Sequence, residues 1–536
     1  MFVIFSYFTV LIWEGFSINL NRLKLLCNYK IFKTGTEFKF NNNSKILAVV
    51  GVNGSGKSIF QEVIVNVFMN IYAKVNKFKV YLDIDYEFEY SLTPTPLLYS
   101  AILNDNNTDF GYENLKEIVV KVISQGKDVF SVKIFYKDRI DSLIELKDVI
   151  DFNIFLPSSL VVYSSGENET ISNELLRYRL INQDKYFNNM FNFNSSDNYK
   201  MNLEYVYNNY RSLLIISILL FDNYKVNKLK DLVEIRELLS FDLNLNLMQR
   251  SRTRVELPER EVYNIKKLLG FSSTFYHQNE DNLGDGSYKL VFKNKHKIIK
   301  DEYLDDPANL YRTLEYLENL NLLKISKSKR KKLIRENSYS IKDIHSYYSN
   351  EKKIFELIDS SILKNDKTCI KILGLSDGEY QVLLIMALLL IHGQKNTLFI
   401  LDEPDTHLNP EWKSKFVSMI SMIKDDYSQC IFSTHNPDVL TDMKSQDIFF
   451  FKNGKLNSVD INTFGANPNI ISSKIFGKNN TISERARREY ERYYHLIEAE
   501  DSIETLERVE QEILYDFGNS SERMMLLNKI YNKQRS

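Results

Sequence analysis

Cysteine is scarce in this chain, and its scarcity excludes a disulfide-stapled domain and a structural zinc site of the CxxC type. Only three cysteines, Cys27, Cys369 and Cys430, occur among 536 residues, and they lie far apart. A disulfide-stapled domain would need an even, closely spaced set, and a structural zinc site would need CxxC pairs. The composition therefore indicates a reducing compartment, and we expect a cytoplasmic protein.

An excess of charge of either sign is also missing. The formal net charge is −1, although 26% of the residues are charged and 44% are hydrophobic. Such a chain is typical of a globular protein and has no overall attraction to nucleic acid or to an anionic membrane. Two local basic runs, at residues 250–254 and 324–335, are each interpreted as a solvated face, with phosphate binding as the alternative.

Long hydrophobic runs are missing as well. The first thirteen residues are mostly apolar, but the run ends at Glu14, short of the about 20 residues that a membrane span needs. It also lacks the basic start and small-residue cleavage site of a signal peptide. We expect a buried first strand or a poorly ordered start, and no membrane partner.

The patterns that are present predict an α/β fold whose core is split between the two ends of the chain. Residues 46–50 form a continuous apolar run of strand length, and 59–72 has helical spacing. Residues 78–165 look rich in strands, 170–350 look largely helical, and the α/β pattern returns from Ile370. In that last part we expect helices at 380–391 and 412–423 and strands at 397–401 and 429–433.

The chain is long enough for several parts. We predict an N-terminal part of an α/β head at 1–169, a mainly helical insertion at 170–355, a C-terminal part of the head at 356–480, and a helical tail at 481–536. No sustained heptad series supports a coiled-coil arm in the insertion.

The first chemical motif is a P-loop. Residues 51–58 read GVNGSGKS and fit GxxxxGK[ST], between an apolar strand and a helix. Glycines let successive backbone N–H groups point at phosphate oxygens, and the helix start adds its positive dipole end. Lys57 would contact the β- and γ-phosphates, and Ser58 would supply a hydroxyl to Mg²⁺. The predicted ATP-binding residues of this loop are Asn53, Gly54, Ser55, Gly56, Lys57 and Ser58.

The second motif is a Walker B strand. Residues 398–403 read LFILDE, an apolar strand that ends in two acids. A carboxylate at the tip of a buried strand is costly unless it has a partner, and Mg²⁺ is the expected partner of Asp402. Glu403 would then act as the general base that polarises the attacking water.

Two further stretches follow the same order along the chain. Residues 375–379 read LSDGE before the 380–391 helix and resemble the ABC signature LSGGE, with Asp377 in place of the first glycine. Ser376 and Gly378 are therefore expected to contact nucleotide. His435, after the 429–433 strand, occupies the place where this class has a histidine that senses the γ-phosphate and assists catalysis.

Together these residues resemble the ABC-type ATPases of the SMC, RecF and OLD group. Residues 25–32 look like that group's N-terminal strand region, and 402–410, DEPDTHLNP, look like its DEPExHLHP stretch. In this group a signature reaches across to the nucleotide held by another subunit, so the resemblance implies a homodimer or higher homo-oligomer. For the glutamine that such ATPases carry, Gln125 is the candidate.

A narrower resemblance is to PtuA, the ATPase of Septu-type bacterial defence systems. It is carried by residues 156–157 and 163–169, and by 463–467, 475–477 and 482–484. The resemblance implies an antiviral role, a partner HNH nuclease (PtuB), and in some systems a retron reverse transcriptase with its DNA–RNA hybrid. The helical tail is then a candidate docking site for the partner.

Other functions remain as alternatives. A RecF- or SMC-like DNA-repair ATPase would act on DNA directly, and a scaffold would keep a purely structural nucleotide site; Glu403 argues against the scaffold. An OLD-type nuclease is disfavoured because about 100 residues follow His435, too few for an added Toprim domain, and no DxD pair occurs there. Since no HNH pattern is present either, we expect no nuclease activity in this chain.

Overall fold

The computed structural model describes most of the chain from Ile18 to Arg535. Outside the described residues lie 1–17, 41–43, 53, 78–83, 107–114, 127–128, 139–142, 147–150, 167–170, 172–174, 176–177, 181–201, 247–258, 273, 278–286, 294–305, 336–352, 425–426, 453, 479–481 and 536. The apolar start of the chain, Asn53 and the basic run at 250–254 therefore lie outside them. Among the described residues, no helix is long and apolar enough to cross a membrane.

A seven-stranded mixed sheet forms the core, in the order β18-β17-β3-β16-β15-β8-β9. Its central strands are parallel and fully buried, which explains their continuous apolar runs. Only β18 runs antiparallel to its neighbour. The strands are β3 (Ile46–Gly51), β8 (Ser159–Ser164), β9 (Asn202–Tyr205), β15 (Thr397–Asp402), β16 (Gln429–Thr434), β17 (Ile448–Lys452) and β18 (Lys455–Asn457).

The order of these strands joins the two ends of the sequence. β3, from the N-terminal part, lies between β16 and β17, and β15 lies between β16 and β8. The predicted split core is thus one sheet, and the strands expected at 46–50, 397–401 and 429–433 are confirmed.

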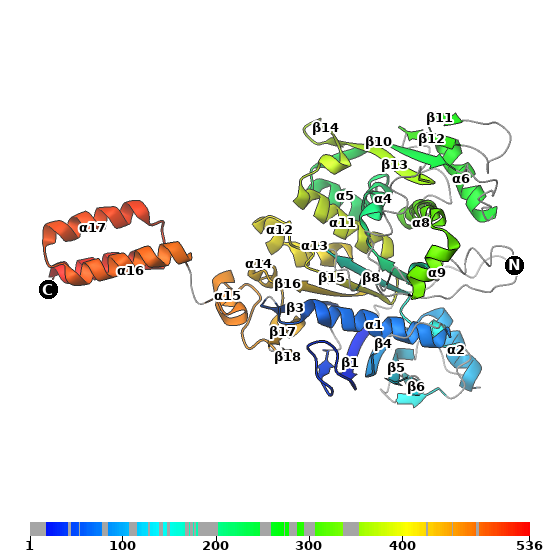
Figure 1. Ribbon diagram of the computed structural model, residues 1–536, viewed down its shortest axis with the longest axis horizontal. Helices are drawn as coiled ribbons and strands as arrows, with labels where there is room; N and C mark the ends of the chain where they lie inside the picture. Colours follow the sequence, from blue (N-terminus) through cyan, green and yellow to red (C-terminus); the bar gives the residue numbers. More distant parts are fainter. Residues whose placement is uncertain are drawn as a thin grey trace, which may run out of the picture. The chain divides into compact units, whose positions relative to one another are not determined.

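A six-stranded antiparallel sheet has the order β2-β1-β4-β5-β6-β7, and α1 (Lys57–Val75) lies between it and the core sheet (Figure 1). Aromatic rings bind these layers: Phe60 packs on Phe38 of β2, and Phe68 packs on Phe88 of β4. The strands are β1 (Asn19–Leu25), β2 (Glu37–Lys39), β4 (Tyr86–Leu92), β5 (Leu115–Gln125), β6 (Val129–Asp138) and β7 (Leu143–Glu145). Helix α2 (Pro96–Asn106) lies between β4 and β5 in the chain, and η2 (Phe152–Phe155) precedes β8.

The insertion contains strands that the sequence analysis did not predict. Besides β9, the insertion contributes β10 to β12 to a five-stranded antiparallel sheet, which β13 and β14 complete from the residues that follow the insertion; its order is β11-β12-β10-β13-β14. In β10, Phe241, Leu243 and Leu245 are buried and alternate with polar residues, a strand signal among residues that otherwise read as helical. The strands are β10 (Ile235–Asn246), β11 (Thr274–His277), β12 (Ser287–Phe292), β13 (Phe355–Lys364) and β14 (Cys369–Lys371).

Helices still outnumber strands in residue count over the described part of the insertion. They are α4 (Asn208–Leu219), α5 (Tyr224–Leu232), α6 (Glu259–Phe271), α8 (Pro307–Asn319), η3 (Leu320–Lys324) and α9 (Lys327–Arg335). The basic run at 324–335 forms the end of η3 and α9. Its Arg330 donates hydrogen bonds to the carbonyls of Leu322 and Ile325, so this arginine closes the end of η3.

Helices of the C-terminal half of the head pack against the core sheet. The helix expected at 380–391 is confirmed within α11 (Asp377–His392). The single helix expected at 412–423 is wrong, because the chain breaks at Lys415 into α12 (Pro410–Ser414) and α13 (Phe416–Ile423). The remaining short elements are η4 (Ile372–Gly374), α14 (Pro437–Leu440) and η5 (Ser445–Asp447). The molecule therefore has the predicted fold class, an α/β P-loop ATPase head with a mixed sheet and flanking helices.

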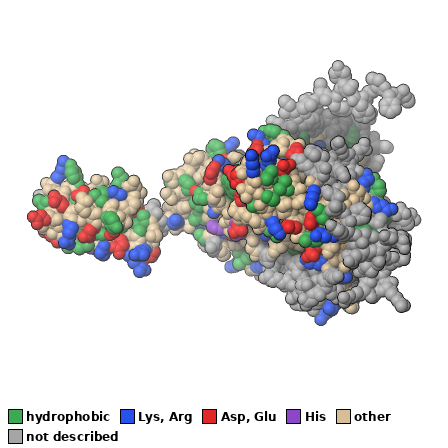
Figure 2. Space-filling model, turned by 90° about the horizontal axis from the view of Figure 1, so that it is seen from above, with side chains coloured by type: hydrophobic (Ala, Val, Ile, Leu, Met, Phe, Trp, Pro, Cys, Tyr) green, Lys and Arg blue, Asp and Glu red, His purple; other side chains and the backbone are tan. Residues whose placement is uncertain are grey.

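Residues from Ala466 to the end form a second compact unit. It contains α15 (Pro468–Phe476), α16 (Glu484–Ala499), α17 (Ile503–Asp516) and α18 (Ser521–Arg535). The last three helices share an apolar core built from Tyr493, Ile497, Leu506, Val509, Ile513, Phe517, Leu526 and Ile530. The predicted tail is therefore helical, and its surface mixes charged and hydrophobic side chains (Figure 2).

Candidate functional site

The P-loop joins the end of β3 to the start of α1 through tightly packed glycines. Gly51 pairs with Phe451 of β17, and a Cβ at this position would lie 2.7 Å from the Phe451 carbonyl oxygen. Gly54 has φ +76°, with no atom within 4 Å of an added Cβ. The loop therefore packs closely against β17 at Gly51 and is open around Gly54, as a loop that surrounds an anion must be.

The first turn of α1 fits a phosphate. Its N-cap residue, Gly56, has no side chain to cap the helix, and no acid occupies the first turn, so the N-terminal N–H groups and dipole meet no side-chain anion there. Ser55 Oγ is buried without a hydrogen-bond partner. These features leave hydrogen-bond donors at the loop that an anion such as a phosphate could use, and the roles of Ser55 and Gly56 in ATP binding stay predictions.

Lys57 lies folded over its own loop. Its Nζ donates to the carbonyl of Gly51 at 2.9 Å and lies 3.4 Å from that of Val52. Burial lowers the pKa of Lys57, while the charges of Glu403 and Asp402 oppose that shift. The ammonium group is therefore partly desolvated and surrounded by acceptors, a setting that favours an anionic ligand.

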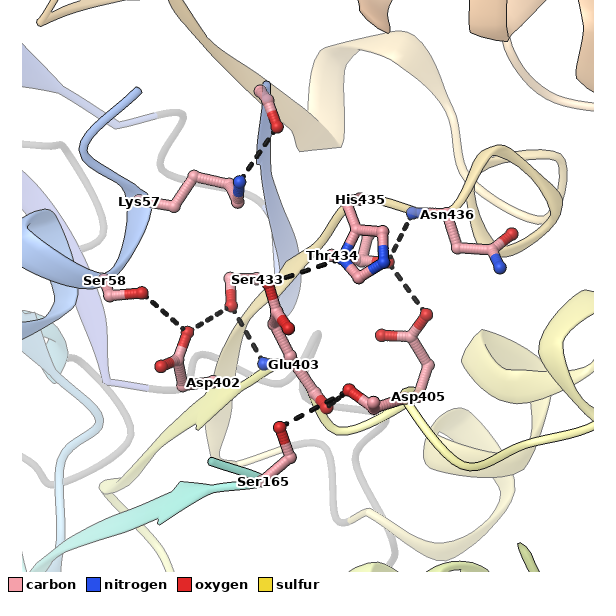
Figure 3. A network of polar contacts seen from close by, with 12 residues as sticks. Lys57, Ser58, Ser165, Asp402, Glu403, Asp405, Ser433, Thr434, His435 and Asn436 are labelled. Atoms are coloured by element: carbon pink, nitrogen blue, oxygen red, sulfur yellow. Dashed lines mark hydrogen bonds and ion pairs between the residues drawn. The ribbon is translucent and has the colours of Figure 1, made fainter. Parts of the chain in front are cut away.

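Three hydroxyl groups surround the Asp402 carboxylate at the end of β15, and Figure 3 shows two of them, those of Ser58 and Ser433. Asp402 Oδ1 accepts from Ser433 Oγ at 2.7 Å and from Ser58 Oγ at 3.2 Å, and its Oδ2 lies 3.4 Å from Ser164 Oγ. Burial raises the pKa of Asp402, the Ser433 hydroxyl lowers it, and Glu403 raises it again. Because burial disfavours the charged carboxylate, a cation bound beside Asp402 would stabilise its ionised form.

Mg²⁺ fits this donor set. The oxygens of Asp402 and Ser58 are hard ligands of the kind that Mg²⁺ prefers, and they converge from β15 and α1. When bound, the ion would neutralise charge on the phosphates of the nucleotide. Ser58 and Asp402 are the residues that would hold it.

Ser164 and Ser165 belong to the site but were not found from the sequence. β8 runs parallel to β15 with Ser164 beside Asp402, so both strands end at the same edge. Ser165 N–H donates to the Asp402 carbonyl at 3.1 Å, and Thr406 Oγ1 lies 3.4 Å from Ser165 Oγ. The signal was the run 159–164, an apolar strand of the same length as the Walker B strand. Gln125, by contrast, ends β5 in the antiparallel sheet.

Glu403 has a left-handed backbone, with φ +49°, directly after the strand. That conformation is unfavourable for a residue with a Cβ and persists where surrounding contacts hold it. Here the Glu403 N–H donates to Ser433 Oγ at 2.9 Å. The same Ser433 hydroxyl donates to Asp402, so one side chain fixes both acids.

His435 follows β16 and reaches the Glu403 side chain. Its Nδ1 lies 3.3 Å from Glu403 Oε1, and both side chains remain partly exposed, 51% for His435 and 33% for Glu403. With a proton on Nδ1, the imidazole donates to the carboxylate. Because Glu403 is accessible beside the P-loop edge, it can contact a water molecule in the position that a general base needs.

A buried layer supports the histidine from below (Figure 3). Thr434 Oγ1 donates to Asp405 Oδ2 at 2.9 Å and accepts from the Asn436 N–H at 3.0 Å. Burial raises the pKa of Asp405, and the Thr434 hydroxyl lowers it. The loop after Walker B and the loop carrying His435 are thereby bonded to each other.

The signature residues form a well-capped helix start. The Ser376 side chain accepts from the Glu379 N–H, and the Glu379 side chain accepts from the Ser376 N–H, a complete capping box. Ser376 is exposed. A Cβ on Gly378 would lie 3.1 Å from the His407 carbonyl and 3.4 Å from the Trp412 ring, so this glycine permits a close approach.

The structure thus brings most of the candidate residues to one edge of the core sheet. Lys57, Ser58, Asp402, Glu403 and His435 meet there. Ser376 and Gly378, within the described part of the chain, contact their own helix and the loop after Walker B rather than these five residues. Of the segments that resemble PtuA, 163–165 reaches the site, and 167–169 lies outside the described residues.

Comparison with known families supports the same chemistry. Residues 46–441, more than half of the chain, match the family described as "AAA domain, putative AbiEii toxin, Type IV TA system". The chain belongs to this AAA family. It is an ATP-hydrolysing enzyme with an ATPase domain, which binds nucleotide, usually with Mg²⁺.

Individual relatives are more distant. The chain is 28% identical over 177 residues to the "Retron Ec83 probable ATPase" of Escherichia coli, a match that spans 31% of each protein. Solved structures that align include the SMC head domain of Thermotoga maritima, at 13% identity and a TM-score of 0.28 over 82% of this chain and 99% of that one. The recombination mediator RecF aligns at 12% identity and a TM-score of 0.27 over 83% of this chain and 100% of that one.

Proposed function

We propose that this chain hydrolyses ATP in a site shared between two copies of itself. The observation that carries the proposal is the meeting of Ser58 and Asp402, at 3.2 Å, beside an uncapped helix start. ATP would lie on the P-loop of one copy, and the exposed Ser376 and the half-buried Gly378 of a second copy would complete its surroundings. That arrangement gives a role to a signature that contacts none of the five P-loop-edge residues in its own chain.

Each residue then has a defined part in the reaction. Lys57 would release the Gly51 carbonyl and turn to the β- and γ-phosphates, because phosphate oxygens are stronger acceptors for an ammonium group. Glu403 would accept the proton of the attacking water, and His435, bonded to Glu403, would contact the γ-phosphate. Asn53, Gly54, Ser55 and Gly56 would donate backbone and hydroxyl hydrogens to the phosphates.

The biological role that we propose is antiviral defence. The chain would be the ATPase of a Septu-like system, of the PtuA type, that controls a partner HNH nuclease in a retron context with a reverse transcriptase and its DNA–RNA hybrid. Support comes from the similarity to a retron ATPase over 177 residues and from the PtuA-like segments. A partner nuclease would supply a cleavage activity for which this sequence carries no motif.

The helical tail is the proposed docking site for that partner. Four large hydrophobic side chains on its surface are more than half exposed: Ile503, Tyr515, Met524 and Met525. Helix α17 also carries more acids than bases, which suits a partner with a basic, nucleic-acid-binding surface. The proposed parts of the chain are therefore 1–169 and 356–480 for the head, 170–355 for the insertion, and 481–536 for the tail.

Co-purification tests this role. The full chain, expressed with the products of its neighbouring genes, should retain an HNH nuclease, and the double variant Tyr515→Ser/Met524→Ser should lose it. Tyr224→Ser, which alters an exposed tyrosine of α5 in the other unit, is the matched control. Retention by the double variant would contradict tail docking. Hydrolysis stimulated by DNA in the purified chain alone would favour the RecF- or SMC-like alternative.

A further inference from the structure

The first turn of α11 is bonded to several parts of the chain at once. Tyr380 OH lies 3.2 Å from Ser212 Oγ of α4. Gln381 Nε2 donates to the Pro404 carbonyl, in the loop after Walker B, at 2.9 Å. The same amide exchanges hydrogen bonds with Tyr163 OH of β8 at 2.8 and 2.9 Å. The signature turn is therefore joined both to the insertion and to the catalytic edge.

Glu379 makes the link that involves charge. One carboxylate oxygen closes the capping box with Ser376, accepting from its N–H at 2.9 Å and its hydroxyl at 2.8 Å. The other forms an ion pair with Lys364, the last residue of β13. The pair is largely covered, with 14% of the Lys364 side chain and 22% of the Glu379 side chain exposed.

Lys364 also holds the end of α5. Its Nζ donates at 2.8 Å to the carbonyl of Val233, the C-cap residue of that helix. A cation at a helix C-terminus is favourable because the last carbonyls and the dipole are negative. Next in the chain, Glu234 has φ +56°, and its carbonyl accepts from the Asn365 N–H at 2.9 Å. One ammonium group thus joins the end of α5, the end of β13 in the five-stranded sheet and the signature turn.

We infer that Lys364 is a positioning residue that couples the five-stranded sheet to the signature turn used in ATP hydrolysis. This inference rests on the proposed function, because the signature matters for turnover only if it completes a nucleotide site. A covered carboxylate that loses its cation keeps only its hydrogen bonds from Ser376, and the charge that is no longer paired favours a rearrangement. Without Lys364, the Ser376 turn would keep its helix but lose its fixed orientation relative to the sheet.

Suitable variants distinguish the effect of the Lys364–Glu379 ion pair from the effect of the helix cap. Glu379→Gln keeps the capping box, which glutamine also completes, and removes only the charge. Lys364→Met keeps the aliphatic stem and removes the ammonium group, whereas Lys364→Arg keeps the charge. Lys289→Met is the matched control, since Lys289 lies on β12 of the same sheet and pairs with Asp242 at 3.8 Å.

The experiment measures kcat, KM and nucleotide affinity of the full chain, with the affinity measured by a fluorescent ATP analogue at high dilution. Lys364→Met and Glu379→Gln should each lower kcat about tenfold, the value of one charge-assisted hydrogen bond. The affinity of the diluted chain should stay within about twofold, because the P-loop itself is unchanged. The double variant should lose no more than either single variant, and Lys364→Arg should recover part of the loss.

Three results would overturn the inference: kcat within about twofold of the unaltered chain, additive losses in the double variant, or an equal loss in Lys289→Met. Dimer formation by Glu403→Gln in the presence of ATP, measured in parallel, tests the shared site independently of Lys364. If that variant stays monomeric with ATP bound, the shared site is wrong and the role of Lys364 falls with it. If the variant dimerises and Lys364→Met keeps full turnover, only the role of Lys364 is wrong.

Discussion

Ser58 Oγ lies 3.2 Å from Asp402 Oδ1, although 344 residues separate them in the sequence. Ser58 opens α1 after β3, and Asp402 ends β15; β16 lies between the two strands in the sheet. All three strands are parallel, so their carboxyl ends meet at one edge. Phosphate-binding and acidic groups from the two ends of the chain are thereby held together by the order of the strands.

Lys57→Ala should lower ATP turnover by about 100-fold or more, since it removes a cation directed at the transferred phosphate. The same substitution at Lys74, at the opposite end of α1, is the control, because Lys74 bonds Ser124 and the Gly126 carbonyl instead. Phosphate release under saturating ATP is the measurement. Equal losses in the two variants would show that the effect comes from the helix rather than from the loop.

Glu403→Gln should lower kcat by about 10²–10⁴-fold while ATP stays bound, because the amide cannot accept the proton of the attacking water. The trapped nucleotide should stabilise a dimer, observable by light scattering coupled to size exclusion. Glu411→Gln, an exposed acid on α12 that pairs with Lys415, should behave like the unaltered chain. A stable ATP-bound monomer of Glu403→Gln would contradict the shared site.

Asp402→Asn should abolish Mg²⁺-dependent turnover yet stabilise the nucleotide-free protein at neutral pH. Burial raises the folded-state pKa of Asp402, so stability is greatest below the ordinary carboxyl pKa and is lost as the pH rises through the raised value. Asparagine keeps the hydrogen bond from Ser433 and carries no charge to bury. The Tm advantage of the variant should therefore grow from acid to neutral pH.

Thermal unfolding in a chelating buffer, across a pH series, checks this expectation. Addition of Mg²⁺ and ATP should reverse the order, since the cation stabilises only the aspartate form. A Tm advantage that stays constant with pH would mean that Asp402 titrates normally in the folded protein.

Two glycines of the P-loop should differ when replaced by alanine. Gly51→Ala forces a methyl group to 2.7 Å from the Phe451 carbonyl, and we expect the free energy of unfolding to fall by about 1–3 kcal/mol. Gly54→Ala meets no atom, and its cost comes from the positive φ alone, about 1–2 kcal/mol. Its methyl group instead points into the open part of the loop, so nucleotide affinity should suffer more than stability. Denaturant unfolding measures the loss of stability in each variant, and nucleotide titration measures the loss of affinity. A larger loss of stability in Gly54→Ala than in Gly51→Ala would contradict the packing at Gly51.

The sequence by itself determined the fold class and the chemical groups, because those signals are local. A buried parallel strand reads as an apolar run, as at 46–50 and 397–401, and a P-loop needs its glycines at fixed spacing. Strand β10 carries a local signal in the alternation at Phe241, Leu243 and Leu245, but the surrounding residues read as helical. The antiparallel pairings of β10 with β12 and β13 and of β11 with β12, which join segments distant in the sequence, decide the conformation. The break at Lys415 likewise has no strong local signal, since no proline or glycine marks it.

Only the tertiary structure decided which of these groups touch. Ser164 and Ser165 enter the site because β8 pairs with β15, and no pattern within 159–165 predicts which strand β8 pairs with. Lys364 reaches Glu379 because the five-stranded sheet ends beside the signature turn. Spacing along the chain fixes what a residue can do within its own strand or helix, whereas contacts between distant strands depend on how all of them share one buried core.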